Sequence, residues 1–580
     1  MPDSWETLLW SSFVYLDARY IGPTRNPVKD LRSGSPHSPA IYRRGPGYVT
    51  RSFQKSFFDR NAGVLWAKII ETQTSWFSVA SAMRNLQSNP VWEASDLGHP
   101  IPDSPHACSV ALPLWDHVIG YEEGREDVIE RLHCGYPRFV IHETVEKAIA
   151  TCAQNFAKTG ESCLVLPSAK SAESCLAFLG DHGHSGDAHA TGRSGVYAVT
   201  FPADAESSAR LFWRCTGEIV GSRQAAAFLQ DGQEPDPTEV RQTGERIRGR
   251  IARLVGQDRD DVYLFPTGMA AVAAVHRLLC GLFPGRKSVQ FDFPYVDVLK
   301  VQQEWGPGVH FFPHAGAEDL AALKKLVSRE PPSGIYCELA SNPLLRLPDM
   351  AAISAFAQEG GFPVVADDTI AGNINIDAYE VADLVTTSLT KYFSGSSDVM
   401  GGSLVVNRDS PFHDELKQRL DADYENLLWP EDARILEVNS RDYPERLRRM
   451  NGTGEILADW LASRPEVETV YYPKFQSELA FRQVARPGAG YAGMLSVDLR
   501  NAASAAPAFY DHLRVSKGPS LGANFTLACP YTLLAHYPEL EWAESCGVSR
   551  YLIRISFGLE DPEDLISRCE VAFGAISREV

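Results

Sequence analysis

Short apolar segments alternate with helical segments between Thr238 and Asn407, and this alternation limits the chain to few folds. The expected helices include 239–255 and 269–282, and the expected strands are 261–265, 288–291, 309–312, 334–338, 364–366 and 384–386. Such alternation predicts a mostly parallel sheet with helices on both faces. We therefore predict an α/β domain whose ligands bind at the carboxyl ends of the strands.

A lysine follows the last of these strands, between a Ser-x-Thr triplet and a Gly/Ser-rich turn. The segment begins Ser388-Leu389-Thr390-Lys391 and runs on to Gly401-Gly402. The preceding strand ends in Asp367-Asp368. A pyridoxal 5'-phosphate (PLP) enzyme needs these groups, because a lysine forms the Schiff base, a carboxylate keeps the pyridine nitrogen protonated and hydroxyls reach the phosphate. We predict PLP as the cofactor.

Lys391 is the predicted catalytic nucleophile, since burial near the strand ends would suppress its charge. The alternative is a surface lysine that happens to follow a strand. Asp367 is the predicted partner of the ring nitrogen, with the adjacent Asp368 as its rival. A carboxylate that caps a helix is the other interpretation of this aspartate pair.

Three further segments carry residues suited to the same cofactor. Gly268, between Thr267 and Met269 at a strand-to-helix turn, lets the backbone approach a phosphate, and the helix start offers free N–H groups. Tyr295 follows a strand and can stack on an aromatic ring, although a core or loop tyrosine is an equal alternative. Arg554 alternates with aliphatic residues and suits a bidentate carboxylate clamp, whereas a solvated outer face is the alternative.

Composition excludes several other classes of protein. The 580 residues carry a net charge of −19, which disfavours nonspecific binding to nucleic acid or anionic membranes. No apolar run is long enough to span a membrane, and the acidic amino terminus differs from a secretory or mitochondrial leader. The cysteines form no C-x-x-C pair, which argues against a zinc site or a disulfide framework. A cytoplasmic enzyme without a metal is expected.

The chain divides into five predicted parts. An amino-terminal extension covers 1–105, with a helix expected over 64–86, and an irregular arm rich in proline and glycine covers 106–145. A small α/β unit, called the inserted unit, covers 146–237. The PLP-binding large domain covers 238–414, and a smaller α/β domain covers 415–580.

These motifs together resemble the Cys/Met-metabolism family of PLP enzymes, the cystathionine gamma-synthase and gamma-lyase group. Segment 382–402 is similar to the lysine motif of that family, and Val364–Thr369 is similar to its Val-Asp-Asn-Thr segment. Glu338–Leu344 matches E-x-x-S-N-P-L. The resemblance implies an aspartate aminotransferase-like, type I fold. It also implies cofactor contacts from Asn342, Ser388, Thr390, Tyr295 and the Thr267-Gly268-Met269 turn.

The resemblance extends to the substrate side and to a partner subunit. Ser520-Leu521-Gly522 is similar to the S-L-G turn beside the substrate carboxylate, and the segment around Arg554 is similar to R-I-S-x-G-x-E-D. Tyr136 and Arg138 match a Tyr-x-Arg pair that reaches the phosphate of a neighbouring subunit in the family. A homodimer or homotetramer with shared active sites is therefore implied.

The resemblance implies gamma-replacement on an O-acyl-L-homoserine with L-cysteine to give L-cystathionine, with Lys391 and Tyr295 moving protons. The long amino-terminal half is similar to fungal cystathionine gamma-synthase. Two departures bear on the second substrate, because Phe525 stands where many relatives carry a glutamate and Asn439–Asp442 replaces R-G-L-x-T. Gamma-elimination or another nucleophile is the nearest alternative. A regulatory, non-catalytic subunit is an alternative from another class.

Overall fold

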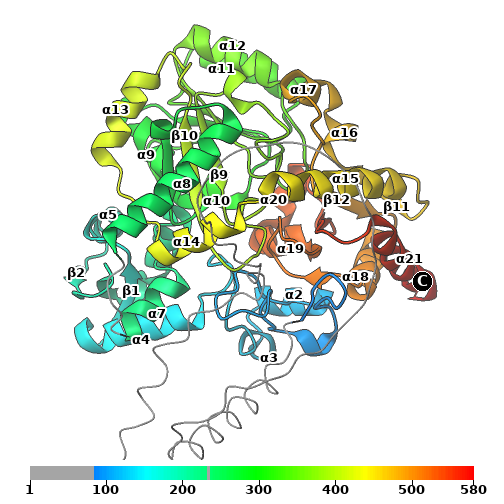
Figure 1. Ribbon diagram of the computed structural model, residues 1–580, viewed down its shortest axis with the longest axis horizontal. Helices are drawn as coiled ribbons and strands as arrows, with labels where there is room; N and C mark the ends of the chain where they lie inside the picture. The colour runs from blue at the N-terminus through cyan, green and yellow to red at the C-terminus, as the bar shows by residue number, and fades with distance from the viewer. Residues whose placement is uncertain (1–83, 231–235, 580) are drawn as a thin grey trace, which may run out of the picture. The chain divides into compact units, whose positions relative to one another are not determined.

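The computed structural model describes residues 84–230 and 236–579 (Figure 1). The helix expected over 64–86 lies outside the described residues except for its last three positions, which are not helical. Within the described ranges, no helix is long and apolar enough to cross a membrane.

A seven-stranded sheet in the order β4-β10-β9-β8-β7-β5-β6 forms the centre of the large domain. Its strands are β4 (Val262–Phe265), β5 (Ser288–Phe291), β6 (Val309–Phe312), β7 (Ile335–Glu338), β8 (Val364–Asp367), β9 (Leu384–Ser388) and β10 (Gly402–Val406). The five strands from β9 to β6 are parallel, as the alternation predicted. The exception is β10, which pairs antiparallel with β4 and β9. The strand β10 was not predicted from the sequence, because Gly401-Gly402 was interpreted as part of a turn.

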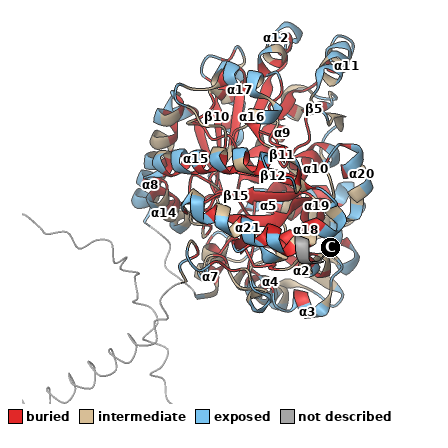
Figure 2. Ribbon diagram, turned by 90° about the vertical axis from the view of Figure 1, so that its right-hand side faces the viewer, coloured by how far each residue is buried: buried red, intermediate tan, exposed pale blue. Residues whose placement is uncertain are grey.

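Alternation of side chains along the strands builds two apolar layers. Along β8, Val364 and Ala366 pack with α11 (Ala317–Val327) and α12 (Met350–Gly360). Between them, Val365 faces the other way, toward α9 (Gly268–Leu282) and α13 (His413–Asp423). Because both faces of the sheet are covered, its strands are almost wholly buried except for the edge strand β6, which is partly exposed along its length (Figure 2).

The carboxyl-terminal region contains a second sheet in the order β11-β12-β15-β14-β13. Its strands are β11 (Val467–Tyr471), β12 (Met494–Leu499), β13 (Ser516–Lys517), β14 (Leu527–Pro530) and β15 (Ile553–Ser556). The main helices beside it are α15 (Tyr443–Ala462), α18 (Ala502–His512) and α21 (Pro562–Glu579). The central strand β15 carries Arg554, so this residue is buried in the sheet rather than exposed on an outer face.

The inserted unit has its own antiparallel sheet in the order β1-β3-β2. Its elements are α4 (Glu143–Phe156), β1 (Glu161–Leu166), α5 (Ala169–Asp181), β2 (Asp187–Ala190), β3 (Tyr197–Pro202), α6 (Glu206–Thr216) and α7 (Ser222–Gln230). Neither β2 nor α7 was predicted from the sequence. The large domain begins with α8 (Pro237–Val255). The arm was expected to be irregular but contains two helices, α2 (Trp115–Glu122) and α3 (Glu126–Ile129).

A substitution at Gly402 tests how tightly β10 packs against the residues at the start of α9. A Cβ atom at this position would lie 2.2 Å from the backbone oxygen of Thr267. We expect Gly402→Ala to lower the free energy of unfolding by about 2 kcal/mol, because backbone atoms cannot move away easily. Urea unfolding followed by circular dichroism measures the change.

The matched control is Gly452→Ala, on the exposed face of α15, where a Cβ atom would meet nothing within 4 Å. Helix propensity predicts that this variant is stabilised by up to about 1 kcal/mol. Equal unfolding midpoints for the two variants would contradict the packing described for Gly402.

Candidate active site

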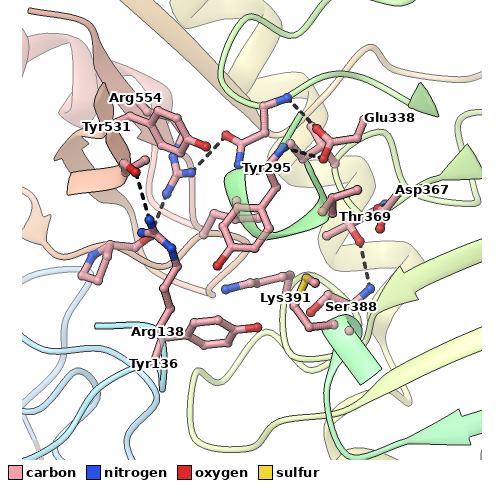
Figure 3. A pocket seen from close by; sticks show the side chains of 18 of the residues that line it. Tyr136, Arg138, Tyr295, Glu338, Asp367, Thr369, Ser388, Lys391, Tyr531 and Arg554 are labelled. Carbon is pink, nitrogen blue, oxygen red and sulfur yellow. Dashed lines mark hydrogen bonds between the residues drawn. The ribbon is translucent and has the colours of Figure 1, made fainter. Parts of the chain in front are cut away.

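One pocket collects residues from the ends of the large-sheet strands, the arm and the carboxyl-terminal sheet (Figure 3). Asp367, Ser388 and Glu338 stand at the carboxyl ends of β8, β9 and β7. The other labelled residues of Figure 3 around the pocket are Tyr136, Arg138, Tyr295, Thr369, Lys391, Tyr531 and Arg554. The pocket thus lies where the α/β alternation predicted a ligand site.

Lys391 points into this pocket from the turn after β9 (Figure 3). Its Nζ donates a hydrogen bond to Ser520 Oγ at 3.1 Å and lies 4.3 Å from the centre of the Tyr136 ring. Burial lowers the pKa of the Lys391 ammonium to about 7, and the positive charge of Arg554 acts in the same direction. A large fraction of this amine is therefore neutral, and nucleophilic, near neutral pH.

The two adjacent aspartates have different surroundings. Asp367 lines the pocket and accepts hydrogen bonds from Thr369 N at 2.9 Å and Thr386 Oγ1 at 3.1 Å. Asp368 is turned away, 1% exposed, and accepts from Thr387 Oγ1. Burial raises the pKa of both carboxyls, while the threonine hydrogen bonds oppose the rise. The pocket therefore offers Asp367, and not its rival, to a bound ring.

The predicted phosphate-binding residues divide into two groups. Gly268, Met269 and Ser388 line the pocket. Ser388 Oγ is buried and has no hydrogen-bond partner among the described residues. A Cβ atom on Gly268 would lie 2.8 Å from the Cβ atom of Ser388, so a larger residue would close this corner. The unpaired hydroxyl, the glycine and the start of α9 suit a phosphate group.

Thr267 and Thr390 do not line the pocket. Thr267 Oγ1 accepts from Ala270 N at 3.0 Å and donates to Gly217 O at 2.9 Å, so it caps α9 and holds the inserted unit. Thr390 Oγ1 bonds the backbone of Gly401. Both hydroxyls are engaged with backbone groups next to the phosphate corner, and their predicted direct contact with the phosphate stays a prediction.

Glu338 organises the opposite wall of the pocket. This glutamate is buried, and in the sequence it was noted only as part of a motif. The two carboxylate oxygens of Glu338 accept from Tyr295 N at 2.7 Å and Asn342 N at 2.8 Å. This bridge fixes the backbone beside the Tyr295 ring and the Asn342 amide. This role could have been predicted from the position of Glu338 at the end of a buried strand, because a buried charged side chain needs hydrogen-bond partners.

Arg554 lies on the substrate side of the pocket and is 3% exposed. It donates to Asn342 Oδ1 at 3.1 Å and to the carbonyl of Pro519 at 2.7 Å, and it lies 4.9 Å from the centre of the Tyr531 ring. Among the described residues, no carboxylate forms an ion pair with it, and its hydrogen bonds go to an amide oxygen and to backbone carbonyls. A buried cation of this kind is a suitable site for a ligand carboxylate.

Tyr136 and Arg138 line the pocket of their own chain. Arg138 donates to Leu534 O at 3.2 Å and Ala535 O at 2.9 Å, and the Tyr136 ring lies beside Lys391 (Figure 3). Within the single chain that the structure describes, both side chains lie in the pocket of their own chain, and the predicted contact of this pair with a neighbouring subunit stays a prediction. The inserted unit follows the arm directly, and this length of chain separates the arm from the large domain.

The fold and these residues define a PLP-dependent enzyme of fold type I. The family described as Cys/Met metabolism PLP-dependent enzyme matches residues 240–574, and the chain belongs to this family. PLP is therefore its cofactor. A second family, the fungal trans-sulfuration enzyme N-terminal domain, matches residues 144–221, which coincide with most of the inserted unit.

Similar proteins include fungal enzymes with related names. Cystathionine gamma-synthase of Neurospora crassa is 34% identical over 81% of this chain and 97% of that protein. A cystathionine gamma-synthase-like enzyme of Amanita muscaria is 32% identical over 83% of this chain and 96% of that protein. A solved cystathionine gamma synthase from Xanthomonas oryzae pv. oryzae, in complex with aminoacrylate and cysteine, has a TM-score of 0.52. It is 24% identical and covers 60% of this chain and 89% of that one, which supports the fold.

The pKa of Lys391 can be tested by adding PLP to the cofactor-free protein at different pH values. Only the neutral amine condenses with an aldehyde, so the rate should rise with pH and reach half its maximum near pH 7. For Arg554→Ala, the half-maximal pH should move upward, because one cause of the lowered pKa is removed. Stopped-flow absorbance in the visible range follows the reaction.

Arg554→Lys keeps the positive charge and should keep a half-maximal pH near that of the wild type. A wild-type value close to 10.5, the ordinary pKa of lysine, would contradict the assignment. An unchanged value in Arg554→Ala would remove Arg554 as a cause.

Proposed function

We propose that this enzyme catalyses gamma-replacement on an O-acyl-L-homoserine, with L-cysteine as the second substrate and L-cystathionine as the product. The observation that carries the proposal is one pocket that joins a charge-suppressed lysine, a half-buried strand-end carboxylate and a buried arginine that has no carboxylate partner among the described residues. The similarity to cystathionine gamma-synthase of Neurospora crassa supports it.

In this proposal, Arg554 binds the α-carboxylate of the amino-acid substrate. Its guanidinium is already oriented by Asn342 Oδ1 and the Pro519 carbonyl, so little side-chain entropy is lost on binding. Because the site is desolvated, the ion pair is stronger than it would be at the surface. The same contact fixes the substrate backbone and directs its Cα–H bond toward one wall of the pocket.

Lys391 is the group that moves protons. Bound PLP supplies a cationic conjugated ring that accepts the electron pair left when the Cα proton departs. Asp367 would hold the ring nitrogen, Ser388 and the start of α9 would hold the phosphate, and Tyr295 would lie against the ring. Lys391 takes the proton from Cα as a neutral amine and later returns it as an ammonium, which suits a pKa of about 7.

The net reaction exchanges one bond at Cγ of the substrate. The Cγ–O bond breaks and the acyl group leaves as a carboxylate, while the cysteine sulfur forms the new Cγ–S bond and its thiol proton is released. Apolar side chains line this part of the pocket and limit the access of water, which would otherwise compete with the thiol. They include Phe139, Ile370, Leu521, Leu534 and Ala535.

A second function has support from one feature of the pocket. Phe525 occupies the position where many relatives carry a glutamate, and it packs with Val91 and Ile101 away from the pocket. No carboxylate from this position is thus available to bind the amino group of cysteine. A gamma-replacement with a nucleophile other than an amino acid, or gamma-elimination to a keto acid, uses the same catalytic residues.

Product analysis separates these reactions. We expect the PLP-loaded enzyme to convert O-acetyl-L-homoserine and L-cysteine to cystathionine, detected by mass spectrometry. Lys391→Ala should lose both turnover and the adduct fixed by borohydride, since no amine remains to bond PLP or to move the proton. If keto acid forms equally with and without cysteine, the reaction is gamma-elimination and not gamma-replacement. An adduct that remains in Lys391→Ala would exclude Lys391 as the lysine that bonds PLP.

The arm arrangement makes a prediction about mixed oligomers. We infer that each chain completes its own pocket, because Tyr136 and Arg138 lie in the pocket that contains Lys391 and Arg554 of the same chain. When inactive Arg138→Ala and Arg554→Ala proteins are mixed and exchange subunits, no active pocket can form, and activity should stay at the level of the unmixed variants.

Exchange itself is confirmed by native mass spectrometry with one variant isotope-labelled. Recovery of about a quarter of the wild-type activity after exchange would show that the arm serves a neighbouring pocket, as the family resemblance implied.

A further inference from the structure

A buried carboxylate behind the pocket wall connects three parts of the chain. Asp297, in the first turn of α10 (Val296–Glu304), is 1% exposed. Its Oδ2 atom accepts a hydrogen bond from Tyr295 OH at 3.2 Å and lies 3.4 Å from Arg138 Nε. Its Oδ1 atom lies 3.3 Å from Arg214 Nε. Two of these partners, Tyr295 and Arg138, line the pocket, and the third does not.

The third partner belongs to the inserted unit. Arg214 lies in the last turn of α6, and this end of α6 packs directly on the pocket-forming helix α9. Cys215 shares a buried apolar cluster with Met269 and Val272, against which Tyr295 also packs. Just after the helix, Gly217 O accepts the hydrogen bond of the Thr267 cap, as described above.

The end of α6 contacts the start of α9 closely, and at Gly217 there is no space for a side chain between them. Gly217 has a φ of +63°, and a Cβ atom there would lie 2.3 Å from Thr267 Oγ1 and 2.8 Å from Ala270 N. Next to it, Glu218 forms an ion pair with Arg277 of α9. The position of Arg214 is therefore fixed relative to the start of α9 and to the Asp297 carboxylate.

We propose that Arg214 and Asp297 are positioning residues, through which the inserted unit holds Tyr295 and Arg138 in the wall of the PLP pocket. This inference rests on the proposed cofactor contacts of Tyr295 and Arg138, but not on the identity of the second substrate. It assigns the inserted unit a role in the active site of this enzyme, although none of the described residues of this unit lines the pocket.

Charge balance is the physical reason. A buried carboxylate needs compensation, and Asp297 has two guanidinium groups, one on each oxygen. Without Arg214, the whole compensation falls on Arg138, whose guanidinium must also face the cofactor. Arg138 is then drawn toward Asp297, and the Tyr295 hydroxyl that shares Oδ2 is displaced with it. The expected consequence is a weaker hold on PLP and a misplaced ring-stacking tyrosine.

Arg214→Ala tests this, with Arg210→Ala as the matched control. Arg210 lies one turn earlier on α6, has a side chain 52% exposed and pairs only with Glu206 among the described residues. We expect Arg214→Ala to weaken PLP binding to the cofactor-free protein about tenfold, the order of effect seen when a buried ion pair loses one partner. Arg210→Ala should bind PLP as the wild type does. Fluorescence titration with PLP gives the dissociation constants.

A double-mutant cycle shows whether Arg214 acts through Asp297. In an Asp297→Asn background, Arg214→Ala should have little further effect on PLP affinity, because the carboxylate that needs compensation is gone. Arg214→Lys should recover part of the loss. The visible circular dichroism of bound PLP is measured on the proteins of the cycle. In Arg214→Ala it should differ from that of the wild type, because Tyr295 is displaced. If Arg214→Ala does not fold, Arg214→Gln retains a polar side chain without the charge and replaces it in the cycle.

Two results would overturn the inference. One is a PLP affinity of Arg214→Ala equal to that of Arg210→Ala, and the other is an additive loss in the Asp297→Asn background. Failure of the proposed reaction is distinguishable from both, since a product other than cystathionine would leave the pattern of PLP affinities unchanged.

Discussion

Desolvation at the carboxyl ends of the large sheet is the constraint on which the rest of the site depends. Burial is the largest cause of the lowered pKa of Lys391 and of the raised pKa of Asp367. The two pKa values move in opposite directions, because burial favours the neutral form of both an amine and a carboxyl group. A cationic cofactor ring would stabilise the charged form of Asp367, while Arg554 holds Lys391 toward its neutral form. The pocket thus has the electrostatic character of a PLP site before any ligand enters.

This desolvation is produced by three separate parts of the chain. The large sheet supplies the floor, β15 of the second sheet supplies Arg554, and the arm covers the remaining side with Tyr136. The inserted unit stands behind this wall, where Arg214 balances the charge of Asp297. Because each part also contributes to the apolar packing around the site, loosening any of them would admit water and reduce the pKa shift of Lys391.

The sequence predicted the large domain well, because its strands are short, apolar and separated by strongly periodic helices. Strands 288–291 and 309–312 have the bounds that the structure shows. The strand β10 was missed because its first residue, Gly402, belongs to a pair of glycines typical of turns. Arm helices α2 and α3 were missed because nearby prolines and glycines hide their short apolar faces. In each case, tertiary packing outweighed the local signal.

The sequence by itself determined much of the chemistry of the site, since Asp367 and Lys391 follow neighbouring strands of a parallel sheet and therefore meet at its carboxyl edge, whereas Arg554 enters from β15 of the second sheet. The tertiary structure decided which of several equivalent polar groups face the ligand. Asp367 points inward and Asp368 outward because neighbouring residues of a strand alternate between faces. Thr267 and Thr390 satisfy backbone groups, whereas the Ser388 hydroxyl remains unpaired. Contacts such as Arg214 with Asp297 join residues far apart in the chain, and only the packing of α6 on α9 and α10 brings them together.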